Sequence, residues 1–360
     1  MKDEIAKLTE AIKVLAKRAG RPLKLMEVCG THTVAIFRHG IRSLLPEQIT
    51  LLSGPGCPVC VTSIKDVDTA VALAQTPGVA LVTFGDMMRV PGGRTSLYGA
   101  RAEGADVRVV YSPLDALEMA RKDSDRKVAF FATGFETTSP LVAATVKTAR
   151  REGLENFFVY PAHKLVPPAL RALLDAPEVR VDGFILPGHV STIIGLRAYG
   201  FLADEYRVPS AVTGFSARDI LEGILMLLEQ IDAGRPEVQN QYEGVVREEG
   251  NPTAVAAIEE VFEPCDAYWR GIGPIPGSGL ALRAELSGLD IRKVITLDVP
   301  EHPEPRACSC GEVLRGLKLP TDCPLFGKAC TPERPVGACM VSTEGSCAAY
   351  YRYGGGAAGG

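Results

Sequence analysis

Apolar and polar positions alternate in two different ways along the first 215 residues. The opening segment has apolar residues three or four positions apart, the spacing of one helix face: Ile5, Leu8, Ile12 and Leu15. Eight short runs rich in apolar and β-branched residues follow at 23–28, 49–53, 79–84, 106–111, 127–133, 156–160, 183–187 and 210–214. Longer stretches rich in Ala, Leu, Arg and Glu separate most of these runs. Buried strands that alternate with helices predict parallel sheets of βαβ units.

The spacing of the eight runs predicts the domain organisation. A polar break at 121–126 divides them into two sets of four. The expected fold is α/β, with two Rossmann-like parallel-sheet domains and a third, irregular α+β domain that carries an iron–sulfur cluster. The predicted parts are an N-terminal helix at 1–20, α/β domains at 21–122 and 123–215, an iron–sulfur domain at 216–353, and a disordered tail at 354–360.

The third part begins with a helix signal. Ser216 suits an N-cap, with Asp219 three positions further on, and an apolar stripe then continues to about Gly234. Beyond Pro236 the sequence looks irregular and is rich in Gly and Pro, as in GIGPIPGSG at 271–279.

Composition excludes several classes of protein. The net charge of −4 gives no basic field for nucleic acid. The N-terminus is charged throughout, unlike a signal peptide, and no apolar run reaches the roughly 20 residues of a membrane helix. We therefore expect a cytoplasmic protein without a membrane partner. Disulfides are rare in that compartment, so ten cysteines indicate metal or redox chemistry.

Reactive side chains follow the predicted strands, where ligands of open parallel sheets bind. They are Cys29, His32, Asp86, Glu136 and His189. Each has a plain alternative. The cysteine and the histidines could be buried structural residues, and the two acids could cap helices. Because such side chains recur in these four loops and in a fifth that carries Cys57 and Cys60, we expect a shared site.

The motif CPVC, with Cys57 and Cys60, follows a Gly-Pro-Gly turn after a predicted strand. A zinc ribbon would need a second close cysteine pair in the same domain, and none is present. A thioredoxin-like redox pair fits better, since a helix N-terminus lowers the pKa of the first thiol. Iron ligation together with Cys29 is a third possibility. We favour the redox pair.

The tail holds six cysteines within residues 308–347. Four thiolates suffice for a [4Fe–4S] cluster, although they would equally satisfy a structural zinc ion. Two further thiols would remain, and a spare pair beside a cluster could exchange electrons with it as dithiol and disulfide.

Six motifs together resemble the HypD family of hydrogenase maturation factors. They are CGTHT (29–33), GPGCPVCVT (54–62), TFGDMMRVPG (83–92), GFETT (134–138), PGHVS (187–191) and the tail from CPLFGKACTP to GSCAAYY (323–351). The resemblance spans nearly the whole chain in order. It implies two α/β domains and a third domain with a [4Fe–4S] cluster.

By this resemblance the protein is a redox-active scaffold, rather than a simple turnover enzyme, for assembly of the Fe(CN)2CO unit of [NiFe]-hydrogenases. Cys29 would hold the Fe(II) that carries CN and CO, with His189 close by, and Cys57 and Cys60 would be a redox pair in the same cleft. Asp86 and Glu136 would orient a histidine or thiol. The implied partners are a small HypC-type chaperone and a HypE-type cyanide donor, and the protein alone would be a monomer.

Spacing in the tail, with a similar arrangement in ferredoxin–thioredoxin reductase, predicts separate roles for its cysteines. The expected cluster ligands are Cys308, Cys323, Cys330 and Cys347, and the expected redox thiols are Cys310 and Cys339. Exchanging Cys308 with Cys310, or Cys339 with Cys347, remains an alternative. The competing function is a cluster-dependent thiol–disulfide reductase, which leaves CGTHT and PGHVS unexplained. A purely structural zinc protein is a third possibility.

Overall fold

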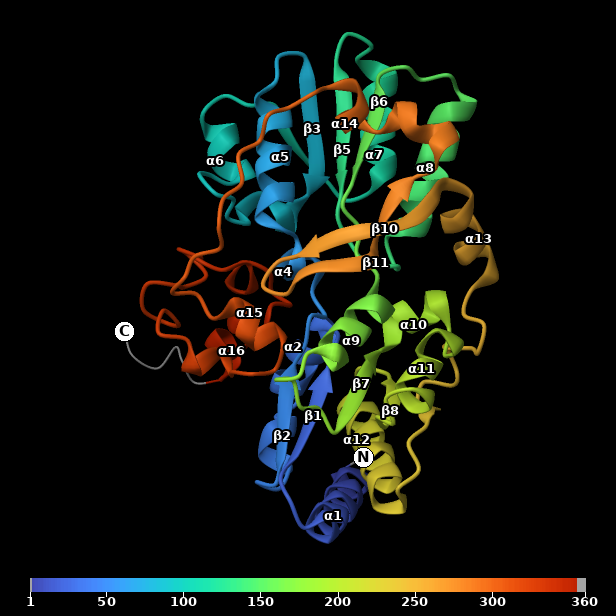
Figure 1. The fold of residues 1–360 in the computed structure, drawn as a ribbon, viewed down its shortest axis with the longest axis vertical. Coiled ribbons are helices and arrows are strands. Elements are labelled where there is room, and N and C mark those ends of the chain that lie inside the picture. Colours follow the sequence, from blue (N-terminus) through green and yellow to red (C-terminus); the bar gives the residue numbers. More distant parts are fainter. Residues whose placement is uncertain (1, 355–360) are drawn as a thin grey trace.

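The computed structural model describes residues 2–354, which form two α/β lobes joined by a β-hairpin, with the cysteine-rich tail packed beside the junction (Figure 1). Within these residues there is one five-stranded and one four-stranded parallel sheet, and one antiparallel pair of strands. The fold class expected from the sequence is confirmed. The strands of both sheets point their carboxyl ends toward the junction (Figure 1).

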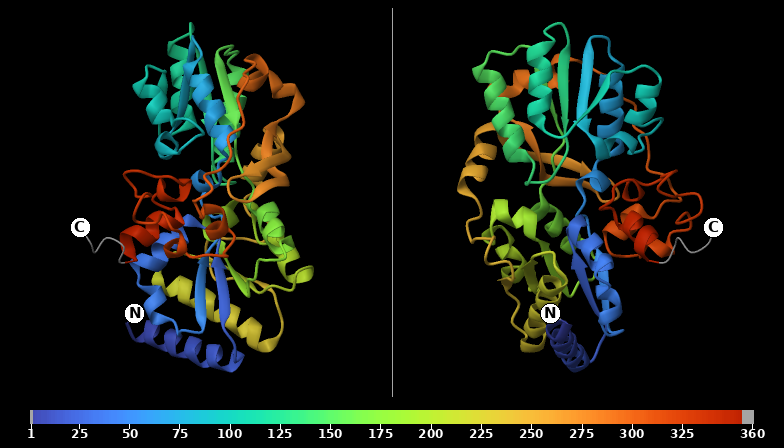
Figure 2. Two further views of the ribbon diagram at one scale, coloured as in Figure 1. Left: turned by 60° about the vertical axis from the view of Figure 1, so that its left-hand side comes forward. Right: turned by 180° about the vertical axis from the view of Figure 1, so that it is seen from behind.

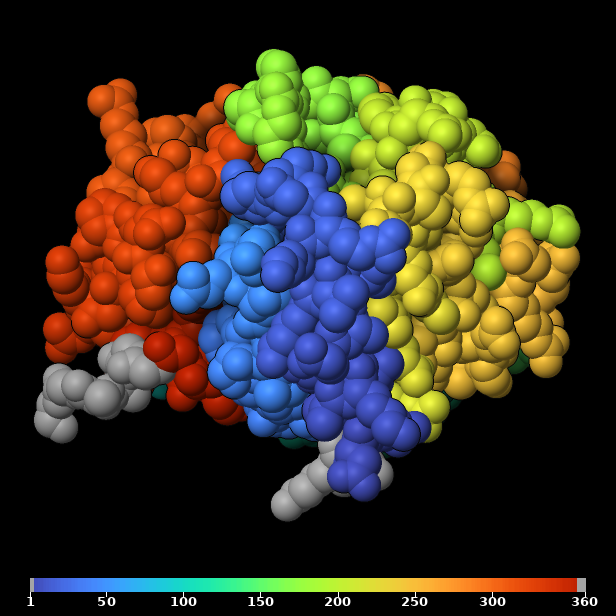
Figure 3. All heavy atoms as spheres, turned by 90° about the horizontal axis from the view of Figure 1, so that it is seen from below, coloured from blue at the N-terminus to red at the C-terminus, as the bar shows by residue number. Residues whose placement is uncertain are grey.

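The lower lobe contains the five-stranded sheet, in the order β2-β1-β7-β8-β9. Its strands are β1 (Leu23–Glu27), β2 (Ile49–Ser53), β7 (Gly183–Pro187), β8 (Ser210–Thr213) and β9 (Val238–Asn240). Its helices are α1 (Lys2–Ala19), α2 (Gly30–Arg38), α3 (Ile41–Leu44), α10 (Gly188–Ile194), η2 (Arg197–Tyr199), α11 (Gly200–Asp204) and α12 (Ala217–Ala233). Seen from below, α1 lies between α12 and the segment around β2 (Figure 3).

The upper lobe contains the four-stranded sheet, in the order β4-β3-β5-β6. Its strands are β3 (Val79–Phe84), β4 (Val107–Val110), β5 (Lys127–Ala132) and β6 (Phe157–Pro161). Its helices are α5 (Ile64–Gln75), η1 (Gly85–Arg89), α6 (Leu97–Ala102), α7 (Pro113–Lys122) and α8 (Ser139–Arg151). Strands β3, β5 and β6 are buried almost throughout, as expected for parallel strands covered on both faces.

The predicted division into two consecutive sets of four strands is wrong. The chain leaves the lower sheet after β2, passes through α4 (Pro58–Val61) into the upper lobe, and returns through α9 (Val166–Asp175) to β7. The ranges 21–122 and 123–215 therefore each contain strands of both sheets. Gly/Pro-rich segments lie at both crossings, GPGCP at 54–58 and the prolines of α9, whereas the polar break at 121–126 is only the turn between α7 and β5.

The region after residue 216 also differs from the expectation of one separate domain. The helix predicted from Ser216 is confirmed as α12, with a capping box to Asp219 and Gly234 at its C-cap, but it packs on the lower sheet together with α1. The segment expected to be irregular instead contains α13 (Pro252–Val261) and the hairpin of β10 (Phe262–Trp269) and β11 (Gly273–Leu282). Strand β11 tolerates prolines because it is an edge strand of a two-stranded sheet. Burial alternates along it, and Pro274 and Pro276 face outward.

From the hairpin the chain runs through η3 (Ala284–Leu289) and α14 (Ile291–Val294) along the upper lobe and descends to the tail (Figure 2). The tail consists of α15 (Cys310–Leu314), η4 (Pro320–Asp322), η5 (Ala338–Met340) and α16 (Ser346–Tyr353), with long loops between them. No helix in residues 2–354 is long and apolar enough to span a bilayer. The tail expected to be disordered from 354 lies, except for its first residue, outside the described residues.

Candidate functional site

The loop that carries Cys29 and the loop that carries CPVC are in direct contact. The backbone N–H of Gly30 donates to the carbonyl oxygen of Gly56 at 2.9 Å, and Gly54 N–H donates to the carbonyl of Glu27 at 2.7 Å. A Cβ atom on Gly56 would lie only 2.2 Å from the backbone nitrogen of Cys29. Position 56 therefore requires glycine, because no side chain fits there between the two loops.

Cys29 is the N-cap residue of α2 and is buried. A buried carboxylate lies beside it: Glu27 accepts from the backbone N–H of Cys29 at 3.1 Å and from the hydroxyl of Thr33 at 2.5 Å. Burial, together with the charges of Glu27 and Glu344, raises the pKa of the Cys29 thiol to about 12. The thiol is protonated at neutral pH, and a bound cation is what would deprotonate it.

Glu27 and Glu344 were not expected from the sequence. Burial raises the pKa of Glu27 to about 7, against the opposing effect of hydrogen bonds from Thr33 and other donors. Glu344, from the tail segment TEGSC, accepts from the hydroxyl of Thr31 at 2.8 Å. The available signal for Glu27 was a charged residue next to the end of the apolar run LKLMEV, where packing alone would favour an apolar residue.

A line of thiols joins the CPVC motif to the tail. The Sγ atom of Cys57 accepts from the backbone N–H of Cys60 at 3.3 Å, and the thiols of Cys57 and Cys339 lie close enough to that of Cys60 to affect its pKa. The Sγ atoms of Cys339 and Cys310 are 2.7 Å apart. The thiol of Cys308 lies close enough to that of Cys310 for its pKa to be raised by it. The thiol line therefore consists of Cys57, Cys60, Cys339, Cys310 and Cys308. Its two parts are far apart in the sequence, because the upper lobe lies between them.

Burial and neighbouring thiols together control the acidity of this group. Burial raises the pKa of Cys60 well above the usual value of a thiol, whereas the pKa of Cys308 is raised first by the adjacent thiol of Cys310 and then by burial. A buried guanidinium, Arg270, lies near Cys310, Cys339 and Cys308, and its Nη1 atom is buried without a hydrogen-bond partner among residues 2–354. Arg270 follows the hairpin strand β10 and was not predicted as a site residue.

The four predicted cluster ligands differ in how they are placed. Cys330 accepts from the backbone N–H of Val336 at 3.3 Å, and it interacts electrostatically with Cys308 and Cys347. Cys323 is the C-cap of the short helix η4, and no hydrogen bond within residues 2–354 joins it to the other three. No three metal-ligating side chains within the described part of the chain converge tightly enough for a single ion.

The two histidines flank one aromatic ring. Phe215 lies 4.7 Å from the ring of His32 and 4.1 Å from that of His189, centroid to centroid. His32 Nε2 donates to the carbonyl of Gly214 at 3.0 Å, and burial lowers its pKa to about 4, so it is neutral. His32 therefore fits the alternative of a buried structural histidine, although its Nδ1 atom has no partner among residues 2–354. On the other side of the Phe215 ring, His189 is exposed at the start of α10.

The two acids lie apart from the thiols. Glu136 is buried and accepts from the backbone N–H of Val166, the first residue of α9, at 2.8 Å. It therefore caps a helix, as the plain alternative stated. Asp86 is exposed on η1, and in residues 2–354 no hydrogen bond or ion pair joins it to another candidate residue. The structure does not bring Asp86 to the histidines or thiols it was expected to orient.

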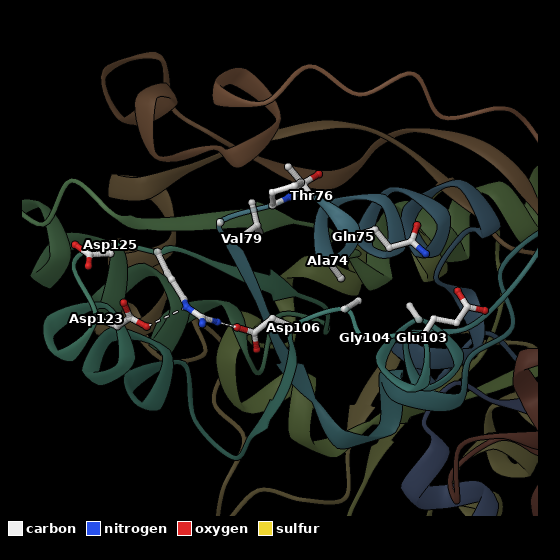
Figure 4. Close-up of a pocket in the computed structure, with 14 residues that line it drawn as sticks. Ala74, Gln75, Thr76, Val79, Glu103, Gly104, Asp106, Asp123 and Asp125 are labelled. Carbon is white, nitrogen blue, oxygen red and sulfur yellow. Dashed lines mark hydrogen bonds and ion pairs between the residues drawn. The ribbon is translucent and has the colours of Figure 1, made fainter.

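A cavity of about 790 Å³ at the amino ends of the upper strands carries none of these residues (Figure 4). Its acids are largely neutralised: Asp106 accepts from Arg108 at 2.8 and 2.9 Å and is paired with Arg126. It lies at the end of the sheet opposite to the thiols, so it adds nothing to the candidate site.

Comparison with known proteins gives one consistent result. Residues 3–354 match the HypD family model, described as the hydrogenase formation hypA family. The chain is 48% identical over 357 residues to hydrogenase maturation factor HypD of Rhodobacter capsulatus, covering 98% of this chain and 94% of that protein. It is 46% identical over 354 residues to hydrogenase maturation factor HypD of Escherichia coli K12, covering 97% and 94%. For the Azotobacter vinelandii protein of the same name, the values are 48% over 341 residues, 93% and 90%.

Proposed function

The chain belongs to the HypD family and acts in hydrogenase maturation, and on that premise we propose that it is the scaffold on which the Fe(CN)2CO unit of [NiFe]-hydrogenases is assembled. The observation that carries this proposal is the contact between the Cys29 loop and one end of the thiol line, at Gly30 and Gly56. Cys29 lies outside the thiol line, and its loop contacts the loop of Cys57 and Cys60, which belong to the line. Such an arrangement suits a site where iron is held while its ligands are added.

In this proposal the iron is cargo and Cys29 is its anchor. Soft thiolate binds iron well, and an iron that takes up CN and CO needs few protein ligands and open positions. The bound cation would displace the thiol proton, which Glu27 is suited to accept because its own carboxylate titrates near neutral pH. His189, exposed on the far side of Phe215 from His32, is available as a second ligand or to orient an incoming one.

The thiol line would carry reducing equivalents by thiol–disulfide exchange. The Cys339 thiolate attacks Cys60 of a Cys57–Cys60 disulfide, and Cys57 leaves as a thiolate that takes up the released proton. Cys310 then attacks the mixed disulfide at Cys339 and releases Cys60. One dithiol and one disulfide exchange roles, so electrons and protons balance. Arg270 would favour the thiolate forms, which burial otherwise disfavours.

We further propose that Cys308, Cys323, Cys330 and Cys347 hold a [4Fe–4S] cluster, which supplies electrons one at a time when bound. The donor set fits, with four thiols left after Cys310 and Cys339 are paired. Backbone N–H groups of Val336 and Gly337 directed at the Cys330 sulfur also suit a cluster ligand, because such hydrogen bonds tune cluster potentials.

A HypC-type chaperone and a HypE-type cyanide donor are the proposed partners, met in the cytoplasm by a monomeric chain. The alternative function is a cluster-dependent thiol–disulfide reductase, and the proximity of Cys310 and Cys339 favours it. It gives no role to Cys29 or to the buried acids around it.

Infrared spectroscopy of the protein, co-purified anaerobically with its HypC-type partner, tests the scaffold directly. The wild type should show bands of iron-bound CN and CO. Cys29→Ala should lose them while keeping its fold and brown colour, and Cys265→Ala, which removes a thiol outside the line, should retain them. Normal CN and CO bands in Cys29→Ala would exclude Cys29 as the anchor.

A further inference from the structure

A cavity of about 630 Å³ lies on the other side of the CPVC helix from the lower lobe, between the upper sheet and the hairpin. Its floor includes Lys164, just beyond the carboxyl end of β6, and the first turn of α5 from Ser63 to Asp66. In open parallel sheets this edge is where ligands bind, and a helix N-terminus there favours negative charge. None of the thiols of the line contributes to it.

Every acidic group in the cavity wall already has a partner. Asp266 accepts from the backbone N–H of Gly277 at 2.9 Å, and Glu304 accepts from that of Gly271 at 2.7 Å. Glu301 pairs with Lys65, 3.2 Å away, at the exposed rim. These acids have protein donors, so a ligand need not supply a cation.

Asp66 is the most fully engaged of the acids. It accepts from the hydroxyls of Ser63 and Tyr160, each at 2.8 Å, and pairs with the ammonium group of Lys164 at 3.4 Å. Burial alone would raise the pKa of Asp66, but Lys164 and the two hydroxyls lower it below its usual value. Asp66 is therefore ionised, and it holds the side chain of Lys164 inside the wall.

The groups with unused hydrogen-bonding capacity are mainly donors. Lys164 is buried, and its three N–H groups have a single ion-pair partner in residues 2–354. Arg292 gives Nε and Nη2 to Asp290, and over the same residues Nη1 has no partner. His163, 1% exposed, has no partner for either ring nitrogen in the described chain, and burial lowers its pKa to about 3, so its neutral ring offers one donor and one acceptor. Because buried polar groups normally find partners, the unused N–H groups of Lys164 point to a missing acceptor.

We propose that this cavity is a second site, which binds a small metabolite through an anionic oxygen group, a phosphate or a carboxylate. Lys164 and Arg292 contact the anion, and the remainder of the molecule lies against the apolar wall of Ile64, Leu280 and Pro303. The volume suits a ligand of metabolite size. The hairpin that forms one wall is bridged through Trp269 to Thr62, the C-cap of the CPVC helix α4, so an occupied cavity would abut that helix.

Isothermal titration calorimetry on the cluster-loaded protein tests the site with three probes: inorganic phosphate, glycerol 3-phosphate and succinate. At least one should bind saturably at one site, and the comparison of succinate with the phosphates tells which anion is preferred. Arg292→Gln, at a half-exposed side chain, should weaken that binding about tenfold or more, because it removes a charge-assisted contact. Lys293→Gln, which removes an exposed neighbouring charge, should leave it unchanged.

Cys265 provides an independent readout of position, since its half-buried thiol lines the cavity. Saturating amounts of the bound probe should slow alkylation of Cys265 by iodoacetamide, followed by peptide mass spectrometry, and should not do so in Arg292→Gln. Two results would overturn the proposal: no saturable binding of any of the three probes, or binding that is equal in wild type and Arg292→Gln and leaves Cys265 unprotected.

Discussion

Glu136 should make the protein less stable as the pH rises through neutrality. Its side chain is 3% exposed, Oε1 accepts from Val166 N–H, and Oε2 has no partner in the described residues. Burial raises its pKa to about 7. The unfolded chain releases this proton near pH 4.5, whereas the folded protein holds it until about pH 7. Between these values the folded state binds more protons, so stability falls with rising pH and levels off above 7.

The size of the effect follows from the same values. The difference between 4.5 and about 7, at about 1.4 kcal/mol for each pH unit, corresponds to about 3 kcal/mol. Glu136→Gln has the shape and hydrogen-bonding groups of the protonated acid and should escape this loss. For a chain of 360 residues, with an unfolding entropy of about 2 cal/mol/K per residue, the variant should melt about 4 °C above the wild type at pH 8.

Differential scanning calorimetry from pH 5 to pH 8 measures this directly. The gap in Tm between Glu136→Gln and the wild type should grow from pH 5 to about pH 7 and then stay level up to pH 8. Glu155→Gln removes an exposed carboxylate from the same lobe and should show no such growth. A gap that stays constant, or a wild type that gains stability relative to Glu136→Gln toward pH 8, would mean that Glu136 is ionised in the folded protein and that burial does not control its protonation.

Three further predictions concern the thiol site. Gly56→Ala should lower Tm and abolish iron–cyanide loading, because its methyl group would collide with the Cys29 backbone. Gly244→Ala, with open space around it, should do neither, and equal behaviour of the two variants would refute the tight loop contact. Mild oxidation should protect Cys310 and Cys339 together from alkylation, reversibly and without unfolding, and thiols that stay fully alkylatable would rule out the pair. Cys323→Ser should bleach the protein and reduce its iron and sulfide content, whereas Cys310→Ser should stay brown. A full iron and sulfide content in Cys323→Ser would show that Cys323 is not a ligand of the proposed cluster.

Local patterns predicted the elements of this fold well. All eight strands form where short apolar runs predicted them, and the helix from Ser216 begins and ends at the residues whose chemistry marks a cap. These features depend on neighbouring residues, which the sequence displays. Assignment of strands to sheets depends on contacts between distant segments, and that prediction failed, since β2 and β3 follow one another but belong to different sheets.

The same distinction holds within the site. CPVC and the tail thiols were recognisable from spacing, whereas the contact between Cys60 and Cys339 depends on how the tail docks. Glu27 and Arg270 were missed because a single charge in a strand or beside a hairpin carries no pattern until its burial is known. Asp86 was included because it follows a strand, but the chain turns there into an exposed η1.

Helix α2 sets the distance between the proposed iron anchor and the proposed cluster. Its N-terminus is capped by Cys29, and its other end holds the tail: the ring of Phe37 lies 4.7 Å from that of Tyr350 on α16. The guanidinium of Arg42 lies 4.9 Å from the Tyr350 ring, and Thr31 bonds Glu344. Cys347, a proposed cluster ligand, lies in the first turn of α16. The contacts of α2 with α16 therefore hold Cys347 at a fixed distance from Cys29, the proposed iron anchor. In the proposed scaffold, electron delivery to the iron would therefore depend on docking of the tail against α2.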